Sequence, residues 1–271
     1  MAAIRAAHPG ARITLLTTVL YVGLLRASPW FDDIRVDSRP KLWNLPGLLS
    51  LRHQLRGFDR VYDLQTSSRS SRYFALAGRP PWSGIAPGCA FPDTNPARTT
   101  THSRERLAGQ LAQAAILKLP VPDLGWMTAD ISRFGLPARF ALLVPGAAAH
   151  RPEKRWPAAH FAALARQMSM PCVVVGGAGD GAHGIPGLDL AGQTSLLELA
   201  AITAHAALAI GNDTGPMHLA AALNIPAIVL FSGASDPALT APRAPDGGWP
   251  VILREPDLKD LPVARVLAAL P

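Results

Sequence analysis

The stretch ALAIGNDTGPMHLAAALN at residues 207–224 carries the strongest structural signal in the chain. Its apolar run Ala207–Ile210 predicts a buried strand, and Gly215–Leu223 predicts a helix that Asn224 ends. The first N–H groups of a helix lack partners within it and carry partial positive charge, so a helix that starts directly after a strand is a ready anion site, most often for phosphate. An ordinary capped helix of a hydrophobic core is the alternative interpretation.

Polar side chains cluster at the start of this predicted helix. Asp213 or Thr214 can cap it, and Thr214 and His218, four residues apart, share one face. Helical side chains lean toward the N-terminus, so His218 leans back toward the same opening. A histidine satisfied inside the core fits the spacing equally well.

A second segment, residues 145–157, repeats this pattern of strand, glycine turn and helix. The apolar run Phe140–Val144 ends at a turn that contains Gly146 and Ala147, and the adjacent cations Lys154 and Arg155 precede a helix that starts near Pro157. Two cations beside a helix start can hold a diphosphate, although a solvated basic loop is the alternative. In open α/β sheets ligands bind at the carboxyl ends of strands, so both segments are expected at one edge.

Two further glycine-rich or polar turns follow predicted strands. Asp63 and Gln65 lie where a strand ends in the N-terminal half; they can meet a substrate, although capping of the next helix is the favoured interpretation. The run GAGDG at residues 177–181 has its third glycine misplaced for a dinucleotide fingerprint, and HGIPG at residues 183–187 cannot continue as a helix. NAD and FAD are therefore not expected.

Strands and helices alternate along the whole chain, which predicts an α/β fold with parallel sheets covered by helices. Prolines between residues 120 and 138 indicate a linker, so we expect two domains, 1–135 and 136–271, with a cleft between them. Residues 79–101 are expected to be irregular. The predicted strands are Ile13–Thr17, Ile34–Val36, Arg60–Leu64, Phe140–Val144, Cys172–Val175, Ala207–Ile210 and Ala227–Phe231, and the predicted helices include Leu42–Arg56, Ser70–Ala77, Arg104–Leu119 and Leu258–Leu270.

The composition fits a folded protein with an uneven charge distribution. Of 271 residues, 49% are hydrophobic and 17% charged, which allows a sizeable core. Residues 1–135 carry 17 basic and 9 acidic residues, net +8, whereas residues 136–271 carry 9 and 10, net −1. The basic half suits a phosphorylated substrate, an anionic membrane surface or nucleic acid, or it is simply an arginine-rich surface. Scattered arginines and the lack of a nucleic-acid-binding motif argue against nucleic acid.

Several other classes of protein are excluded by the sequence. No apolar run reaches the roughly 18–20 residues of a membrane span. Residues 13–25 resemble a signal peptide less than a short strand followed by a short helix, because polar residues interrupt them. Two cysteines, Cys89 and Cys172, suit a reduced cytosolic chain, and no histidine pair has metal-ligand spacing. We therefore expect neither a metal nor a cofactor.

Together these segments resemble glycosyltransferase family 9, the ADP-heptose:lipopolysaccharide heptosyltransferase family. The similarity spans most of the chain and is most specific in its C-terminal half. The matching stretches are Pro145–Ala147, Lys154–Pro157, Leu190–Leu196 and Gly211–Leu223, with His8–Ile13, Ala27–Trp30 and Tyr62–Gln65 in the N-terminal half.

The resemblance implies a GT-B fold of two Rossmann-like domains and inverting sugar transfer without a covalent intermediate. The C-terminal domain would bind the nucleotide-sugar donor, typically ADP-heptose, and the N-terminal domain a lipopolysaccharide core precursor. Lys154 would contact the donor phosphates, with Gly146, Ala147 and Arg155 beside it. The diphosphate and sugar would be surrounded by residues of the later motif, Asp213, Thr214, Gly215 and His218.

The start of the chain departs from the family pattern. Family members begin with a strand and a Gly-Asp turn whose aspartate acts as general base, whereas Met1–Arg5 already falls in the expected first helix. We therefore expect the reading frame to extend upstream of Met1 by about 10–20 residues, carrying that base. Asp63 and Asp93 are substitutes that nothing in the sequence favours.

The leading hypothesis is an inverting glycosyltransferase that moves a sugar from a nucleotide-diphosphate sugar to a lipopolysaccharide-type or other glycan acceptor. The family resemblance implies that this sugar is heptose and the donor ADP-heptose. It would be cytoplasmic and peripheral on the inner face of the cytoplasmic membrane, where a phosphorylated glycolipid acceptor fits the basic N-terminal half. The alternative is a catalytically degenerate nucleotide-sugar-binding homologue. A nucleotide-sugar epimerase would need a Tyr-x-x-x-Lys pair, and Tyr21, Tyr62 and Tyr73 all lack the lysine.

Overall fold

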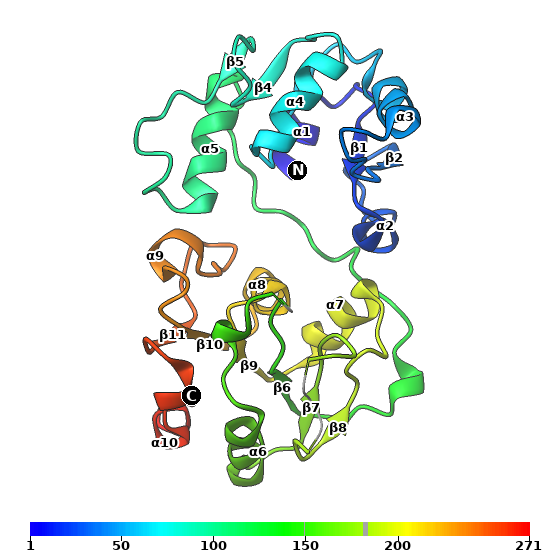
Figure 1. Ribbon diagram of the computed structural model, residues 1–271. Helices are drawn as coiled ribbons and strands as arrows, with labels where there is room; N and C mark the ends of the chain where they lie inside the picture. Colours follow the sequence, from blue (N-terminus) through cyan, green and yellow to red (C-terminus); the bar gives the residue numbers. More distant parts are fainter. Residues whose placement is uncertain (149, 181–183) are drawn as a thin grey trace. The chain divides into compact units, whose positions relative to one another are not determined.

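The chain forms two compact units, Met1–Val121 (unit 1) and Pro122–Pro271 (unit 2), in a computed structural model that describes residues 1–148, 150–180 and 184–271. Each unit is of the α/β type (Figure 1). Every strand pairing among the described residues is parallel, as the alternation of elements predicts. The division falls within the predicted linker, and Phe134 packs into the core of unit 2.

Unit 2 is built on one continuous six-stranded sheet of order β11-β10-β9-β6-β7-β8. In chain order this is the Rossmann arrangement, in which the direction of strand addition reverses between β6 and β9. Gly211 stands where β9 meets β6, since a Cβ there would lie 2.5 Å from the Cβ of Val144. The strands are β6 (Ala141–Val144), β7 (Cys172–Val174), β8 (Leu188–Asp189), β9 (Leu208–Asn212), β10 (Ala227–Phe231) and β11 (Val251–Arg254).

Apolar side chains cover both faces of this sheet. Leu142 and Val144 of β6 point into one core cluster, and Ala141 and Leu143 point into the other, so all four are at most 1% exposed. This is the burial expected of a central parallel strand. The helices are α6 (Ala158–Gln167), α7 (Leu196–His205), α8 (Gly215–Ala222), α9 (Pro237–Thr240) and α10 (Val263–Leu267), with short 3-10 turns at Ser132–Phe134, Pro152–Lys154 and Leu258–Asp260.

The structure corrects the sequence predictions for unit 2 in two places. The closing helix predicted over Leu258–Leu270 is interrupted, because Pro262 separates a 3-10 turn from α10. The strands β8 and β11 were missed, since one is two residues long and the other is exposed at both ends. The run GAGDG at residues 177–181, excluded as a dinucleotide fingerprint, and the run HGIPG after it are described only in part, because residues 181–183 lie outside the described residues.

Unit 1 contains two separate parallel sheets, one of order β1-β2 and one of order β3-β4-β5. The strands are β1 (Thr14–Thr17), β2 (Asp33–Val36), β3 (Val61–Tyr62), β4 (Trp82–Gly84) and β5 (Phe91–Pro92). The helices are α1 (Ala2–Ala7), α2 (Val19–Leu25), α3 (Leu45–Leu55), α4 (Ser68–Leu76) and α5 (Ser103–Gln113).

Two predictions for unit 1 are wrong in their extent. The helix predicted over Arg104–Leu119 ends at Gln113, because Ala115 adopts a left-handed φ of 64° and turns the chain. The stretch predicted to be irregular, residues 79–101, contains β4 and β5. The prediction of a strand followed by a helix over residues 13–25 is confirmed by β1 and α2.

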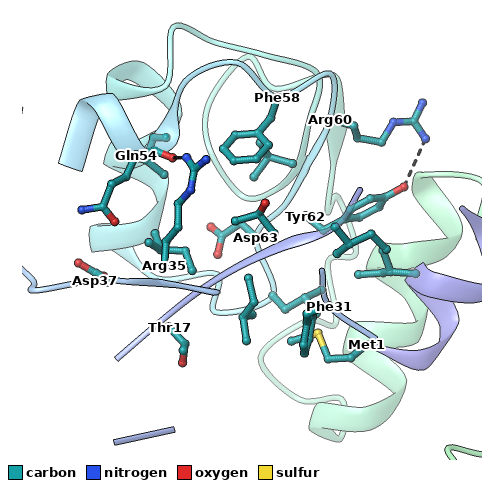
Figure 2. Close-up of a pocket in the computed structure, with 18 of the residues that line it drawn as sticks. Met1, Thr17, Phe31, Arg35, Asp37, Gln54, Phe58, Arg60, Tyr62 and Asp63 are labelled. Carbon is teal, nitrogen blue, oxygen red and sulfur yellow. Dashed lines mark hydrogen bonds between the residues drawn. The ribbon is translucent and has the colours of Figure 1, made fainter. Parts of the chain in front are cut away.

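A cavity of about 1300 Å³ touches both sheets of unit 1. It is lined by the whole of β1 and of β3, by Arg35 of β2, and by side chains from the loops beside the strands, among them Phe31 and Asp63 (Figure 2). The carbonyl oxygens of Ile13 and Thr17 accept hydrogen bonds from the N–H groups of Asp32 and Asp37, which flank β2. Because the backbone groups of successive residues in a parallel strand point to opposite sides, those of Thr14 and Leu16 point away from β2. In the other sheet, the N–H groups of Val61 and Asp63 donate to the strand β4 side, so the backbone groups of Tyr62 between them point away from β4.

Candidate functional site

The predicted donor-site residues gather at the carboxyl ends of β6 and β9, the two strands that flank the reversal of the unit 2 sheet. Gly146 and Ala147 follow β6 after one proline, and Lys154 and Arg155 end the same loop. Residues 213–218 follow β9, which pairs with β6 along four positions. The sheet thus brings together two segments that lie more than 50 residues apart in the sequence, at the edge where ligands bind in such folds.

The side chain of Asn212 joins these two strand ends. It is fully buried, and its Nδ2 donates to the carbonyl oxygen of Pro145 at 2.7 Å and to that of Gly146 at 3.3 Å. Its Oδ1 accepts from the backbone N–H of Trp156 at 3.0 Å. One amide therefore fixes both ends of the β6 loop against β9, because every bond it makes satisfies a buried backbone group.

Asp213 is the centre of the polar cluster. Its Oδ2 accepts from Lys154 Nζ at 2.6 Å and from Ser235 Oγ at 2.9 Å, and its Oδ1 lies 3.8 Å from His218 Nε2. The Asp213 side chain is 6% exposed and that of Lys154 18%. Burial alone would raise the pKa of this carboxyl, but hydrogen bonds from its three neighbours and the ammonium charge outweigh it and hold the pKa below its usual value.

The start of α8 remains open to an acceptor. Thr214 occupies the N-cap position, but its hydroxyl donates to the carbonyl of Asn212 at 3.2 Å, and no side chain among the described residues caps the helix. The prediction that Asp213 or Thr214 caps it is therefore wrong. The His218 side chain is 47% exposed, so the interpretation of a core histidine is wrong as well.

Arg155 shapes the loop after β6. Its Nη2 donates to the carbonyl of Ala147 at 2.7 Å and lies 3.5 Å from Asp180 Oδ1. The carboxylate of Asp180 also accepts from the N–H of Gly177 at 2.6 Å, and a Cβ on Gly146 would lie 2.1 Å from Asp180 Oδ2. Gly146 is thus required because this carboxylate occupies the space beside it. Arg155 holds the loop, and Lys154 is the cation at the polar cluster.

Sequence reasoning missed Asn212, Asp180 and Ser235 as parts of this site. Ser235 lies just after β10, the neighbour of β9, so the rule that polar residues after adjacent parallel strands converge would have identified it once the strand order was known. Asp180 follows β7 in the same way.

The weaker candidates, Asp63 and Gln65, lie in unit 1 at the end of β3. Asp63 Oδ1 accepts from the N–H groups of Gln65 at 3.1 Å and Thr66 at 3.0 Å, which closes a turn. The next helix, α4, is capped by Ser67 instead, so the favoured interpretation that these residues cap it is wrong. Figure 2 shows Asp63 among the residues that line the cavity.

The Asp63 carboxyl is in an unusual environment. It is buried, and its Oδ2 has no hydrogen-bond partner among the described residues. Burial raises its pKa, and the N–H and hydroxyl donors around it offset only part of that effect. Asp93, the other proposed substitute for a base, is instead engaged by Arg98 Nε at 2.7 Å.

Fold and site together define an α/β protein whose second unit is a Rossmann-type domain with a cationic cluster at an open helix start. A model of glycosyltransferase family 9 (heptosyltransferase) matches residues 48–248, and the chain belongs to this family. Lipopolysaccharide heptosyltransferase 2 of Escherichia coli is 30% identical over 229 residues, which are 71% of this chain and 65% of that relative. The match thus spans less than two thirds of the relative's length.

Two solved structures share the fold over almost the entire chain. The E. coli ADP-heptose lps heptosyltransferase II matches with a TM-score of 0.76 and 23% identity, covering 99% of this chain and 91% of that one. A family 9 glycosyl transferase from Veillonella parvula matches with a TM-score of 0.80 and 21% identity, covering 99% and 89%. The predicted α/β fold of GT-B type is thereby confirmed.

Proposed function

We propose that this chain is a glycosyltransferase that moves heptose from ADP-heptose to a lipopolysaccharide acceptor, with inversion at the anomeric carbon. Donor binding is assigned to unit 2 and acceptor binding to the basic unit 1. The observation that carries the proposal is the Lys154 ammonium, held 2.6 Å from Asp213 beside the uncapped start of α8. Family membership and the names of the relatives support heptose and ADP as sugar and nucleotide.

The cluster suits a diphosphate leaving group. Lys154 has three N–H donors, of which Asp213 takes one, so the ammonium retains donors for phosphate oxygens. As the acceptor hydroxyl attacks, the bond from the anomeric carbon to the diphosphate breaks and the leaving ADP takes the electron pair. The Lys154 charge and the helix start both stabilise that developing negative charge.

Asp213 keeps this arrangement in place. Its lowered pKa leaves the carboxylate ionised at neutral pH, so it orients Lys154 and Ser235 through charge-assisted hydrogen bonds. No residue, Asp63 included, is assigned the role of the base that receives the acceptor proton.

Calorimetry with ADP tests the donor site. Lys154→Ala removes a charge-assisted contact worth roughly 1.5–3 kcal/mol, so the affinity for ADP should fall about 10- to 150-fold. Lys259→Ala is the matched control, because its side chain is 77% exposed and lies 3.9 Å from Asp257, and ADP affinity should not change. Equal affinity in both variants would refute the donor site.

Transfer is measured separately with ADP-heptose and a lipopolysaccharide core acceptor. Release of ADP that depends on the acceptor supports the proposal. Tight ADP-heptose binding without transfer would identify a nucleotide-sugar-binding homologue instead.

A further inference from the structure

Helix α3 and the turn before it expose an unusual amount of apolar surface. Leu42 is 64% exposed, Trp43 77%, and Leu45 and Leu49 67% each. The same helix buries Leu51 and Leu55 in the core of unit 1, so it is apolar on two separate faces. Isolated exposed leucines are ordinary, but four large apolar side chains exposed within eight residues form a patch that needs a partner.

Cations flank this patch along the sequence, and the segment that contains it has no acidic residue. Leu45, Leu49 and Arg52 follow one another at i, i+4 and i+7, so the apolar face of α3 continues into an exposed arginine. A second exposed arginine, Arg56, follows the last residue of the helix. Arg39 and Lys41 precede the patch in the sequence and are also exposed. The sequence holds no Asp or Glu from residue 38 to residue 58.

The aromatic ring in the patch is already engaged by one of these cations. Lys41 Nζ lies 5.0 Å from the centre of the Trp43 ring, which places the ammonium over an exposed indole. An indole next to basic side chains is the combination enriched where proteins meet the headgroups of a bilayer, because the ring is amphipathic and long cationic side chains reach back toward phosphate.

We infer that this surface, residues 39–56, docks the protein on an anionic lipid bilayer, with the leucines and Trp43 at the acyl boundary and the four cations among the headgroup phosphates. A second copy of the chain is a poorer occupant, because a two-fold contact would bring the same four cations face to face. No helix among the described residues is long and apolar enough to cross a membrane. The inference goes beyond sugar transfer and does not depend on the donor site.

Co-sedimentation with vesicles tests the inference on the full chain. The protein should bind vesicles of phosphatidylglycerol and phosphatidylcholine, bind pure phosphatidylcholine far more weakly, and be released by salt. Replacing two inserted leucines in Leu45→Ser/Leu49→Ser should weaken binding at least about tenfold. The matched control is Leu117→Ser/Leu119→Ser, which removes leucines that are 79% and 48% exposed outside the patch and should bind as the wild type does.

Two further measurements separate insertion of the patch into lipid from loss of folding. Melting temperature should be the same for the Leu45→Ser/Leu49→Ser variant and the wild type, since the replaced side chains are exposed. Tryptophan fluorescence should shift to the blue on vesicle addition, and Trp43→Phe should abolish that shift.

Absence of vesicle binding, or equal binding by both double variants, would overturn the inference. A dimer in solution that Leu45→Ser/Leu49→Ser dissolves would also overturn it and assign the patch to a second copy. ADP binding by calorimetry reports separately on the proposed function.

Discussion

In unit 2 six strands form one continuous sheet, whereas in unit 1 five strands form two sheets with a cavity of about 1300 Å³ against both. The four residues of β6 are at most 1% exposed, but those of β1 are all only half-buried. The polar cluster around Asp213 lies on the continuous sheet. A site whose polar side chains must be held at fixed distances is best supported by strands that are paired on both sides. The backbone groups of such strands all have hydrogen-bond partners, so the strands cannot shift.

Amide hydrogen exchange should show the largest difference between the units. No sheet pairing among the described residues engages the N–H groups of Thr14, Leu16 and Tyr62, so they should exchange through local opening. The amides of β9 and β10 should exchange only by unfolding of unit 2, slower by several orders of magnitude. Similar protection in both units, measured by NMR, would contradict the comparison.

A buried amide in each unit ties strand ends together, and the two should differ in their contribution to stability. Asn212→Leu leaves two carbonyls and one N–H without partners, which should cost about 2–4 kcal/mol of unfolding free energy. Gln110 Nε2 donates to the carbonyl of Asp63 at 2.9 Å and, at 3.3 Å, to the carbonyl of Ser83, which already accepts from the N–H of Asp63. Its Oε1 has no partner among the described residues. Gln110→Met should therefore cost about 1 kcal/mol or less. Urea denaturation measures both, and equal losses would mean that the strand ends are equally well fixed.

Sequence patterns predicted the buried elements of unit 2 well, because continuous apolar runs such as Ala227–Phe231 mark strands covered on both faces. They missed β8 and β11, whose short or partly exposed residues carry no such signal. The contact between Asp213 and Ser235 could not be predicted, because it depends on β10 lying next to β9.

Two buried carboxylates should respond to pH in opposite ways. The folded-state pKa of Asp213 is depressed, so its contribution to stability is present at neutral pH and is lost as pH falls through that pKa. The folded-state pKa of Asp63 is raised, so its favourable contribution exists only at low pH and is lost as pH rises through that pKa. At pH 7, Asp213→Asn should destabilise unit 2 by about 1.5–3 kcal/mol through lost charge-assisted bonds.

Asp63→Asn should instead leave stability at pH 7 unchanged or raise it, since the amide oxygen can still accept from Gln65 and Thr66 without a buried charge. Denaturation at pH 7 and in mild acid separates the two cases. A loss of stability at pH 7 in Asp63→Asn would show that its carboxylate has a partner that stabilises the charge.

The smallest difference is expected between two histidines, one in each unit. His218 is 47% exposed beside Asp213, so His218→Ala should change the melting temperature little, but ADP-heptose affinity should fall about 2- to 12-fold through one lost hydrogen bond.

His8 Nε2 lies 2.7 Å from the hydroxyl of Tyr62 in unit 1, with the ring centres 5.8 Å apart. His8→Ala should lower the melting temperature and leave donor affinity unchanged, because its partner belongs to unit 1 and the donor site to unit 2. Scanning calorimetry and donor titration of both variants measure the two properties independently. If His218→Ala destabilised the protein and still bound ADP-heptose normally, His218 would be a structural residue and would not belong to the donor site.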